Sequence, residues 1–358
     1  MDHHPRPDST PAPGDAVLAP PMPVILRGDA RALPLQDASV DLVVTSPPYY
    51  ALRSYQDGGD HYVGQLGDEP SPRDYLAALL DCTREMVRVL KPTGSIFLAL
   101  GDKYSGAQGQ TQTGVHGRQH RTDTAATWRQ TDPRRTGIPN KSLMLLPERF
   151  RIAAVDELGL IARAVIIWAK PNGLPESVTD RVRRSHEDWV HLTTQPRYYA
   201  DLDEIRELYD GDRALSRRVK HFGPGKHVQR AAWHRQHLRG RIPGSVWLVS
   251  AQPLTVPASL GVDHYAVFPP QWPSRLVRAW SPLGGVVLDP FGGTATTALT
   301  AALNGRTGIS VDLSADYGRL ARWRATDPRE RARAAGTDPA KAAPADPAQP
   351  DLFGGLTE

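Results

Sequence analysis

Short apolar runs alternate with amphipathic stretches along the middle of the chain. The runs cover residues 40–45, 95–100, 164–168, 246–249, 286–288 and 307–311, and their continuous hydrophobicity predicts buried strands. Amphipathic stretches between such runs are typical of helices that cover both faces of a sheet. The pattern therefore predicts an α/β fold with a mainly parallel sheet.

The clearest helix signal begins at Ser71. Pro72 falls in the first turn and Asp74 lies three residues after the serine, as in a capping box. Cys82, the single cysteine of the chain, lies within this helix and is expected to be a packing residue. One cysteine also excludes an internal disulfide and a cysteine-rich zinc site.

Composition changes at both ends of the chain. Residues 1–22 and 327–358 are rich in Pro, Ala and Asp and have almost no large apolar side chains, so flexible tails are expected. Between them, the pattern predicts a domain in two parts, 23–204 and 246–326, separated by 205–245. A further aperiodic segment, 103–141, is expected to be a loop insertion in the first part.

The charge is concentrated in two segments. The 358 residues carry a net charge of +4, whereas 211–245 carries +8 and 103–141 carries +5. Tryptophan and histidine side chains among the arginines favour a polyanion-binding surface over solvated loops. The candidate DNA-contacting residues are Arg213, Arg217, Arg218, Lys220, Lys226, Arg230, Arg235, Arg239 and Arg241, with Arg134 and Arg135 in the other segment.

Several classes of protein are excluded by the sequence. No stretch approaches the roughly 18 to 20 consecutive apolar residues of a membrane helix, and the first residues lack the order of a secretion signal. The histidines of the basic segment occur without a tight ligand quartet, so no metal site is expected. The chain is expected to be a soluble, cytoplasmic protein.

The first predicted strand ends in a proline turn, Ser46-Pro47-Pro48-Tyr49. Two prolines fix the backbone and remove two N–H donors, which leaves carbonyl oxygens as acceptors. The Ser46 hydroxyl and the Pro47 carbonyl could bind an exocyclic amine of a nucleobase, and Tyr49 offers a stacking face. A rigid turn that only ends the strand is the alternative.

Residues 284–317 contain a strand, a glycine turn that opens a helix, a second strand and an acidic residue. Glycines let a ligand approach the backbone, and Asp312, about 20 residues beyond the turn, could bind ribose hydroxyls. Gly292-Gly293 does not fit G-x-G-x-x-G, and no P-loop lysine follows. A cofactor with a nucleoside and a charged amino-acid end fits better, and Asp289 could bind its ammonium group directly or through water.

Together, the two turns resemble the motifs of the S-adenosylmethionine-dependent DNA amino-methyltransferases that modify cytosine N4 or adenine N6. Ser46-Pro47-Pro48-Tyr49 resembles the catalytic motif of this family, and residues 289–293 resemble its cofactor motif. The order of the two motifs is that of the circularly permuted beta group. Other stretches similar to this group are Gly28-Asp29-Ala30, residues 168–172 continuing to Arg181 and His186-Glu187, and His264 with Phe268-Pro269.

The resemblance implies a Rossmann-like methyltransferase fold, with a mostly parallel seven-stranded sheet and an inserted DNA-recognition region at 205–245. It implies direct methyl transfer from S-adenosylmethionine to a flipped base of double-stranded DNA, and a restriction endonuclease as a possible partner. The arginines of 205–245 would divide between phosphates and guanine edges. The implied cofactor-binding residues are Asp29, Ala30, His264, Phe268, Asp289, Phe291, Gly292, Gly293, Thr294 and Asp312.

Two positions bear on the details of the activity. Ser46 favours N4-cytosine, because adenine enzymes of this family more often have Asp or Asn there. Ala295 stands where glycine is common; a positive φ there would cost about 1 kcal/mol or more, but we expect Ala295 in the first turn of the following helix. An N6-adenine enzyme, a methyltransferase of RNA or protein, and a non-catalytic DNA-binding relative remain alternatives.

An apolar pair interrupts the C-terminal tail within Gln349-Pro350-Asp351-Leu352-Phe353. These residues are similar to the short peptides by which bacterial DNA enzymes bind the replicative sliding clamp. Gln349, Leu352 and Phe353 are therefore candidate clamp contacts, and packing of the tail on the domain is the alternative.

Overall fold

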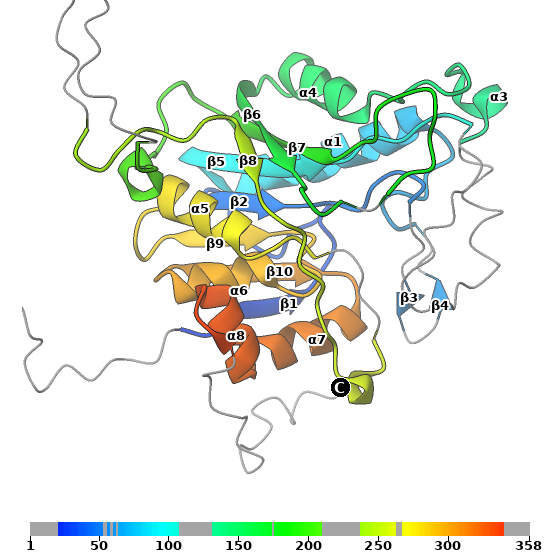
Figure 1. Ribbon diagram of the computed structural model, residues 1–358. Helices are drawn as coiled ribbons and strands as arrows, with labels where there is room; N and C mark the ends of the chain where they lie inside the picture. Colours follow the sequence, from blue (N-terminus) through cyan, green and yellow to red (C-terminus); the bar gives the residue numbers. More distant parts are fainter. Residues whose placement is uncertain are drawn as a thin grey trace, which may run out of the picture.

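The computed structural model describes residues 21–52, 56–57, 60–61, 64–106, 131–173, 175–209, 237–262 and 267–339. The strands of the main sheet are β1 (Val24–Arg27), β2 (Val40–Thr45), β5 (Leu90–Leu100), β6 (Ile161–Ala169), β7 (His186–Thr193), β8 (Val246–Leu248), β9 (Val286–Asp289) and β10 (Thr307–Asp312). Their order across the sheet is β1-β10-β9-β2-β5-β7-β6-β8 (Figure 1). A separate pair consists of β3 (Gln56–Asp57) and β4 (Asp60–His61).

Most strands of the main sheet run parallel. The strands β1, β10, β9, β2 and β5 run parallel to one another. Strand β7 is antiparallel to both of its neighbours, β5 and β6, and β8 runs parallel to β6. The predicted α/β fold is therefore confirmed. In the part of the chain that the structure describes, however, the main sheet has eight strands, whereas seven were predicted.

The apolar runs did not indicate β1 and β7. Strand β1 lies at one edge of the sheet with its ends exposed, and β7 begins with three polar residues, so neither carries a long apolar run. Strand β8 was predicted as buried, but Val246 and Leu248 are 57% and 75% exposed because β8 forms the other edge.

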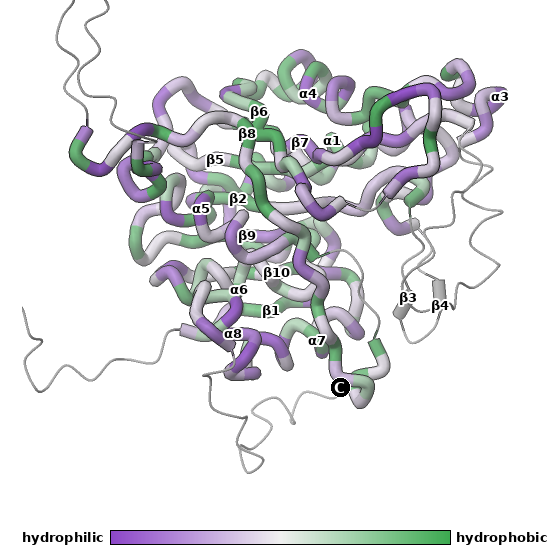
Figure 2. Tube along the Cα trace, in the orientation of Figure 1, coloured by the Kyte–Doolittle hydropathy of each residue, from purple (hydrophilic) through white to green (hydrophobic). Residues whose placement is uncertain are grey.

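Helices cover both faces of the sheet (Figure 1). On one face lie α1 (Pro72–Val89) and α4 (Leu146–Asp156), and on the other lie α5 (Gln271–Trp280) and α6 (Thr296–Leu303). Near β1 follow α7 (Ala315–Thr326) and α8 (Pro328–Ala335). The shorter helices are α3 (Pro133–Thr136), η1 (Leu202–Ile205) and η2 (Ala258–Leu260). Figure 2 shows apolar residues concentrated along the central strands, which form the core between the helices.

Helix α1 begins as predicted. The Ser71 side chain accepts a hydrogen bond from the Asp74 backbone N–H, and the helix ends at Val89. Cys82 is 2% exposed, and burial raises the pKa of its thiol to about 12. Cys82 is therefore a packing residue with little thiolate character at neutral pH.

Helix α8 lies inside the segment that was predicted to be a flexible tail. Asp327 caps it through the Arg329 and Glu330 N–H groups, and Pro328 occupies its first turn. The helix buries Glu330 and Ala334, a charged and a small side chain, so a search for large apolar residues misses it. Most of the rest of the two predicted tails, residues 1–20 and 340–358, lies outside the described residues. The clamp-like peptide is part of the second of these ranges.

The two ends of each basic segment are held together by a β-bridge. An antiparallel bridge between Tyr104 and Leu143 closes the base of the first, and a bridge between Glu207 and Arg241 closes the base of the second. Within the described ranges, no helix is long and apolar enough to cross a membrane.

Candidate functional site

The predicted site residues follow neighbouring strands at one edge of the sheet. The strands β1, β10, β9, β2 and β5 are parallel, so the residues after their carboxyl ends lie along the same edge. In this order they bring Asp29, Asp312, Asp289, Ser46 and Gly101 to that edge. The proline turn and the glycine turn are therefore adjacent in space, although more than 240 residues separate them in sequence.

One hydrogen bond joins the two turns directly. Thr45, the last residue of β2, donates from Oγ1 to Asp289 Oδ1 at 2.6 Å. Both side chains are buried. Thr297 of α6 also donates to the β2 backbone, at Val44, over 3.0 Å. These contacts fix the start of the proline turn relative to the glycine turn.

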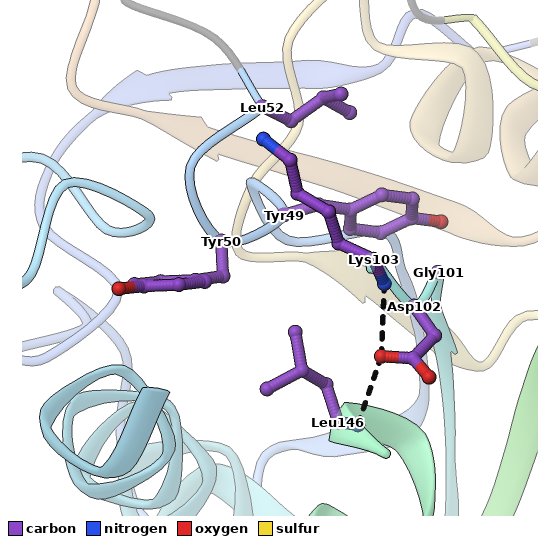
Figure 3. Close-up of a pocket in the computed structure, with 7 residues that line it drawn as sticks. All are labelled: Tyr49, Tyr50, Leu52, Gly101, Asp102, Lys103 and Leu146. Carbon is purple, nitrogen blue, oxygen red and sulfur yellow. Dashed lines mark hydrogen bonds between the residues drawn. The ribbon is translucent and has the colours of Figure 1, made fainter. Parts of the chain in front are cut away.

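The proline turn is held from behind by α1. Tyr75 donates its hydroxyl hydrogen to the Pro48 carbonyl at 3.0 Å, and its ring packs against buried Tyr50 with 5.6 Å between centroids. Gly67 passes so close that a Cβ there would lie 2.8 Å from the Tyr49 carbonyl oxygen. Tyr49 and Tyr50 extend in opposite directions from the turn (Figure 3).

Tyr49 is enclosed by three other elements. A Cβ at Gly101 would lie 2.7 Å from its ring, so the ring requires glycine at that position. Its hydroxyl donates to Glu187 Oε2 at 2.9 Å and lies 3.5 Å from the Ser46 hydroxyl. Burial and the neighbouring charge of Glu187 raise the pKa of Tyr49 well above its usual value, so the phenol is neutral.

Asp102 and Lys103 follow Gly101 and line a cavity beside Tyr49 (Figure 3). The Asp102 carboxylate accepts hydrogen bonds from the N–H groups of Lys103, Leu145 and Leu146, which fixes the start of α4. Burial lowers the pKa of Lys103 to about 8, and its ammonium group donates to the Ala51 carbonyl.

Asp289 is a buried carboxylate at the start of the glycine turn. It is 2% exposed and accepts hydrogen bonds from Thr45 and from the Phe291 N–H. Burial raises the pKa of Asp289 to about 6, although these hydrogen bonds act in the opposite direction. A cation that approached this carboxylate would compensate its buried charge.

Asp312 is oriented by the backbone at the end of β10. Its Oδ2 accepts from the Gly293 N–H and its Oδ1 from the Ser314 N–H, both at 2.8 Å. Gly292 brings the turn onto β10, because a Cβ there would lie 1.8 Å from the Ser310 hydroxyl. The carboxylate of Asp312 is thus held next to the glycine turn, where the sequence pattern predicts a ribose-binding group.

Ala295 does not lie in the first helical turn, as expected, but precedes it. Its φ and ψ are 57° and 32°, the left-handed conformation, and α6 begins only at Thr296. The expectation was wrong because the chain must reverse tightly between Gly292 and the helix, and the Ala295 N–H bonds to the Gly292 carbonyl at 2.7 Å. The alanine therefore carries the strain that a glycine would avoid.

A buried ion pair supports the glycine turn from its other side. Arg324 of α7 and Glu330 of α8 are 2% and 4% exposed and lie 3.0 Å apart. Arg324 also donates to the hydroxyls of Thr294 and Thr296, at 2.8 and 2.6 Å. Phe268 lines a cavity together with Arg324, so this predicted residue lies on the same side of the turn.

The remaining predicted cofactor residues have mixed surroundings. Ala30 is buried, and Phe291 packs at the edge of the core. Asp29 follows β1 and accepts hydrogen bonds from the Arg31 backbone and guanidinium group. Burial alone would raise the pKa of Asp29, but these hydrogen bonds outweigh it and lower the pKa. His264 lies outside the described residues.

Four of the predicted DNA-contacting residues belong to the described ranges. Arg134 and Arg135 are exposed on α3. Arg239 and Arg241 lie near the acidic side chains of Glu204 and Glu207, at 3.9 and 3.7 Å, so the positive field at this end is weaker than the charge count suggests. The others, Arg213, Arg217, Arg218, Lys220, Lys226, Arg230 and Arg235, lie outside the described residues.

The residues at this edge fit a nucleoside cofactor with a charged amino-acid end. A buried carboxylate, a tight glycine turn and a backbone-oriented carboxylate on the next strand supply the required types of contact. The described residues contain no group of three or more His, Cys, Asp and Glu side chains arranged for a metal ion.

Sequence reasoning missed three contributors to the site. Thr45 and the Arg324–Glu330 pair gave no signal, because their roles depend on contacts between distant segments. Glu187 lies in a stretch that resembled the family, but no role was assigned to it.

Several known proteins are similar to this chain in sequence or in fold. The family described as DNA methylase, of N6 and N4 methyltransferases, matches residues 40–322. The type II methyltransferase M.SmaI of Serratia marcescens is 34% identical over 314 residues, 84% of this chain and 89% of that protein. M.XycI of Xanthomonas campestris pv. cyanopsidis is 31% identical over 328 residues, 88% and 94% of the two chains. The solved structure of the cytosine-N4-specific PvuII DNA methyltransferase shares the fold, with a TM-score of 0.56, 20% identity, and coverage of 85% of this chain and 86% of that chain.

Proposed function

The chain belongs to the DNA methylase family of N6 and N4 methyltransferases, and from this premise we propose that it methylates the exocyclic N4 of cytosine in double-stranded DNA. Enzymes of this family depend on S-adenosylmethionine. When bound, this cofactor supplies an electrophilic methyl group on a sulfonium sulfur. The hydrogen bond between Thr45 and Asp289 carries the proposal, because it joins the amine-binding turn to the cofactor-binding turn.

The chain's own residues position the reactants. The Ser46 hydroxyl and the Pro47 carbonyl accept hydrogen bonds from the cytosine amine, and the ring of Tyr49 stacks on the flipped base. Asp312 binds ribose hydroxyls and Asp289 binds the ammonium group of the cofactor. Base flipping costs a few kcal/mol, and fixed positioning of the amine supplies most of the acceleration.

Two observations support cytosine rather than adenine. Ser46 occupies the first position of the turn, where the adenine enzymes more often have Asp or Asn. The PvuII enzyme, whose fold this chain shares, is named as cytosine-N4-specific. An N6-adenine activity is the second candidate, because the family includes both types.

Product analysis tests the proposed base. Purified protein is incubated with DNA and labelled S-adenosylmethionine, and the DNA is digested to nucleosides. N4-methylcytosine is the expected product, and N6-methyladenine as sole product would contradict the assignment. Ser46→Ala should abolish most of the labelling, whereas Ser177→Ala, at an exposed serine of the 170–185 segment, should retain it.

A binding measurement tests the rival of another class, a non-catalytic DNA-binding relative. Calorimetry of the wild-type protein with S-adenosylmethionine should show binding, and Asp312→Asn should weaken it. Asp156→Asn, at an exposed carboxylate at the end of α4, is the matched control. No heat of binding with the wild-type protein would favour the non-catalytic relative.

We further propose that residues 205–245 recognise the target sequence. Charge reversal at Arg217 and Arg218 should weaken DNA binding and reduce its dependence on salt. Unchanged affinity at several salt concentrations would contradict this role. The relatives are named type II methyltransferases, so a restriction endonuclease with the same recognition site is the expected partner.

A further inference from the structure

A carboxylate and an ammonium group lie directly behind the catalytic tyrosine. Glu187, on β7, accepts the hydrogen bond of the Tyr49 hydroxyl on Oε2 at 2.9 Å. Its other oxygen, Oε1, accepts from Lys170, which follows β6. The Lys170 ammonium nitrogen also lies over the ring of Trp168, 4.1 Å from the ring centroid. The carboxylate is thus held by one partner on each oxygen.

The chemistry of these groups fixes the direction of the hydrogen bonds. An ionised carboxylate can only accept, so the Tyr49 hydroxyl must donate to Glu187. The oxygen of Tyr49 is then the acceptor toward Ser46, whose hydroxyl lies 3.5 Å away. Ser46 consequently donates toward Tyr49, and its oxygen faces the site as an acceptor. The hydroxyl hydrogens of Ser46 and Tyr49 therefore both point away from the site, in the direction of Glu187.

The surroundings keep this arrangement in place at neutral pH. The raised pKa of Tyr49 keeps its proton on the phenol, where it can be donated. Glu187 and Lys170 are 19% and 22% exposed, so the pair is largely shielded but still reached by solvent.

We propose that Ser46, Tyr49 and Glu187 form a proton relay that removes a proton from the target amine during methyl transfer. This proposal rests on the proposed methylation of an exocyclic amine. Glu187 acts through Tyr49 and is a positioning and proton-accepting residue that does not touch the base. The amine of cytosine is a weak nucleophile because its lone pair is delocalised into the ring, so proton removal makes the lone pair available for attack.

The bonds in this step balance. The amine nitrogen forms a bond to the methyl carbon while the carbon–sulfur bond breaks, and that electron pair stays on sulfur. The nitrogen gives a proton to the Ser46 oxygen, Ser46 gives its hydroxyl proton to Tyr49, and Tyr49 gives its own to the Glu187 carboxylate. The nitrogen becomes a neutral methylamine, and Glu187 becomes neutral until it releases the proton to water.

Glu187→Gln tests the relay, because glutamine can accept a hydrogen bond from Tyr49 but is not a base at neutral pH. Glu176→Gln is the matched control: Glu176 is also in a partly exposed ion pair, with Arg181 at 2.7 Å. Single-turnover methyl transfer to DNA should slow at least about tenfold in Glu187→Gln, as expected for loss of general base assistance. The affinities for S-adenosylmethionine and DNA should stay within about twofold of wild type, since Glu187 contacts neither.

Two further measurements separate proton transfer from a structural role. Formate should restore part of the rate to Glu187→Ala but not to Ser46→Ala, because it can replace only the missing carboxylate. In the protein without cofactor or DNA, the Cζ signal of 13C-labelled Tyr49 should shift in Glu187→Gln and stay unchanged in Glu176→Gln.

Failure of the proton relay can be distinguished from failure of the proposed base. A Glu187→Gln rate within twofold of wild type, a rate loss explained by weaker binding, or an unshifted Tyr49 signal would each overturn the relay. If the wild-type protein forms N6-methyladenine, the assignment of cytosine fails, but the relay still applies, since adenine N6 is also an exocyclic amine.

Discussion

Replacement of Ala295 by glycine measures the strain in the glycine turn. The left-handed φ of 57° costs a non-glycine residue about 1 to 2 kcal/mol. The substitution also removes a methyl group that is 1% exposed, worth about 0.8 kcal/mol, and adds the chain entropy of glycine, about 0.5 to 1 kcal/mol. These terms nearly cancel, so Ala295→Gly should change the free energy of unfolding little.

Ala298→Gly is the matched control for this experiment. Ala298 packs in the same small cluster and is equally buried, but it lies inside helix α6 with ordinary backbone angles. The Ala298→Gly substitution removes the buried methyl group and adds the chain entropy of glycine, but it relieves no backbone strain. The free energy of unfolding should therefore fall by about 1.5 kcal/mol. Urea unfolding should place the two variants about 1 to 2 kcal/mol apart. Equal losses in both would refute the idea that Ala295 is strained.

Three other predictions follow from buried side chains. The pKa of Asp289 is about 6 in the folded protein, compared with 3.8 for an ordinary aspartate in the unfolded chain. At pH values between these two pKa values, folding is therefore accompanied by the uptake of a proton. The resulting stabilisation is present below pH 4 and is lost as the pH rises through 6; urea unfolding should show this dependence in wild type and not in Asp289→Asn. Glu330→Gln leaves Arg324 buried without its carboxylate, so thermal unfolding should show a loss of about 3 to 5 kcal/mol, and S-adenosylmethionine should bind more weakly. Arg333→Gln, which removes the more exposed partner of Glu330, should cost less than about 1 kcal/mol. Cys82 should react with alkylating reagents only when the protein is unfolded, and reaction in the native state would contradict its burial.

The sequence predicted the parts of the site that depend on local patterns. The proline turn and the glycine turn could be located because each ends a buried apolar strand, and the Asp312 carboxylate because of its distance from the turn. The cap of α1 could also be predicted from a local pattern, because it involves Ser71 and Asp74, which are only three residues apart.

Contacts between distant segments could not be predicted in this way. The strain at Ala295 depends on where the turn must reverse, which residue types alone do not determine. Arg324 and Glu330 look like ordinary surface charges in the sequence, and only the packing of α7, α8 and the glycine turn buries them. Strand β7 is polar at its start because that end faces the site, which hides it from a search for apolar runs.

The strand order has a consequence for the chain while it is being made. Among the strands of the main sheet, β1 and β2 are translated first, whereas β9 and β10, which lie between them in the sheet, are translated last (Figure 1). Until then, one edge of β2 has no partner strand, and such edges favour aggregation of nascent chains. Because Thr45 meets Asp289 only when this gap closes, the growing chain has no complete site until both β9 and β10 have been made.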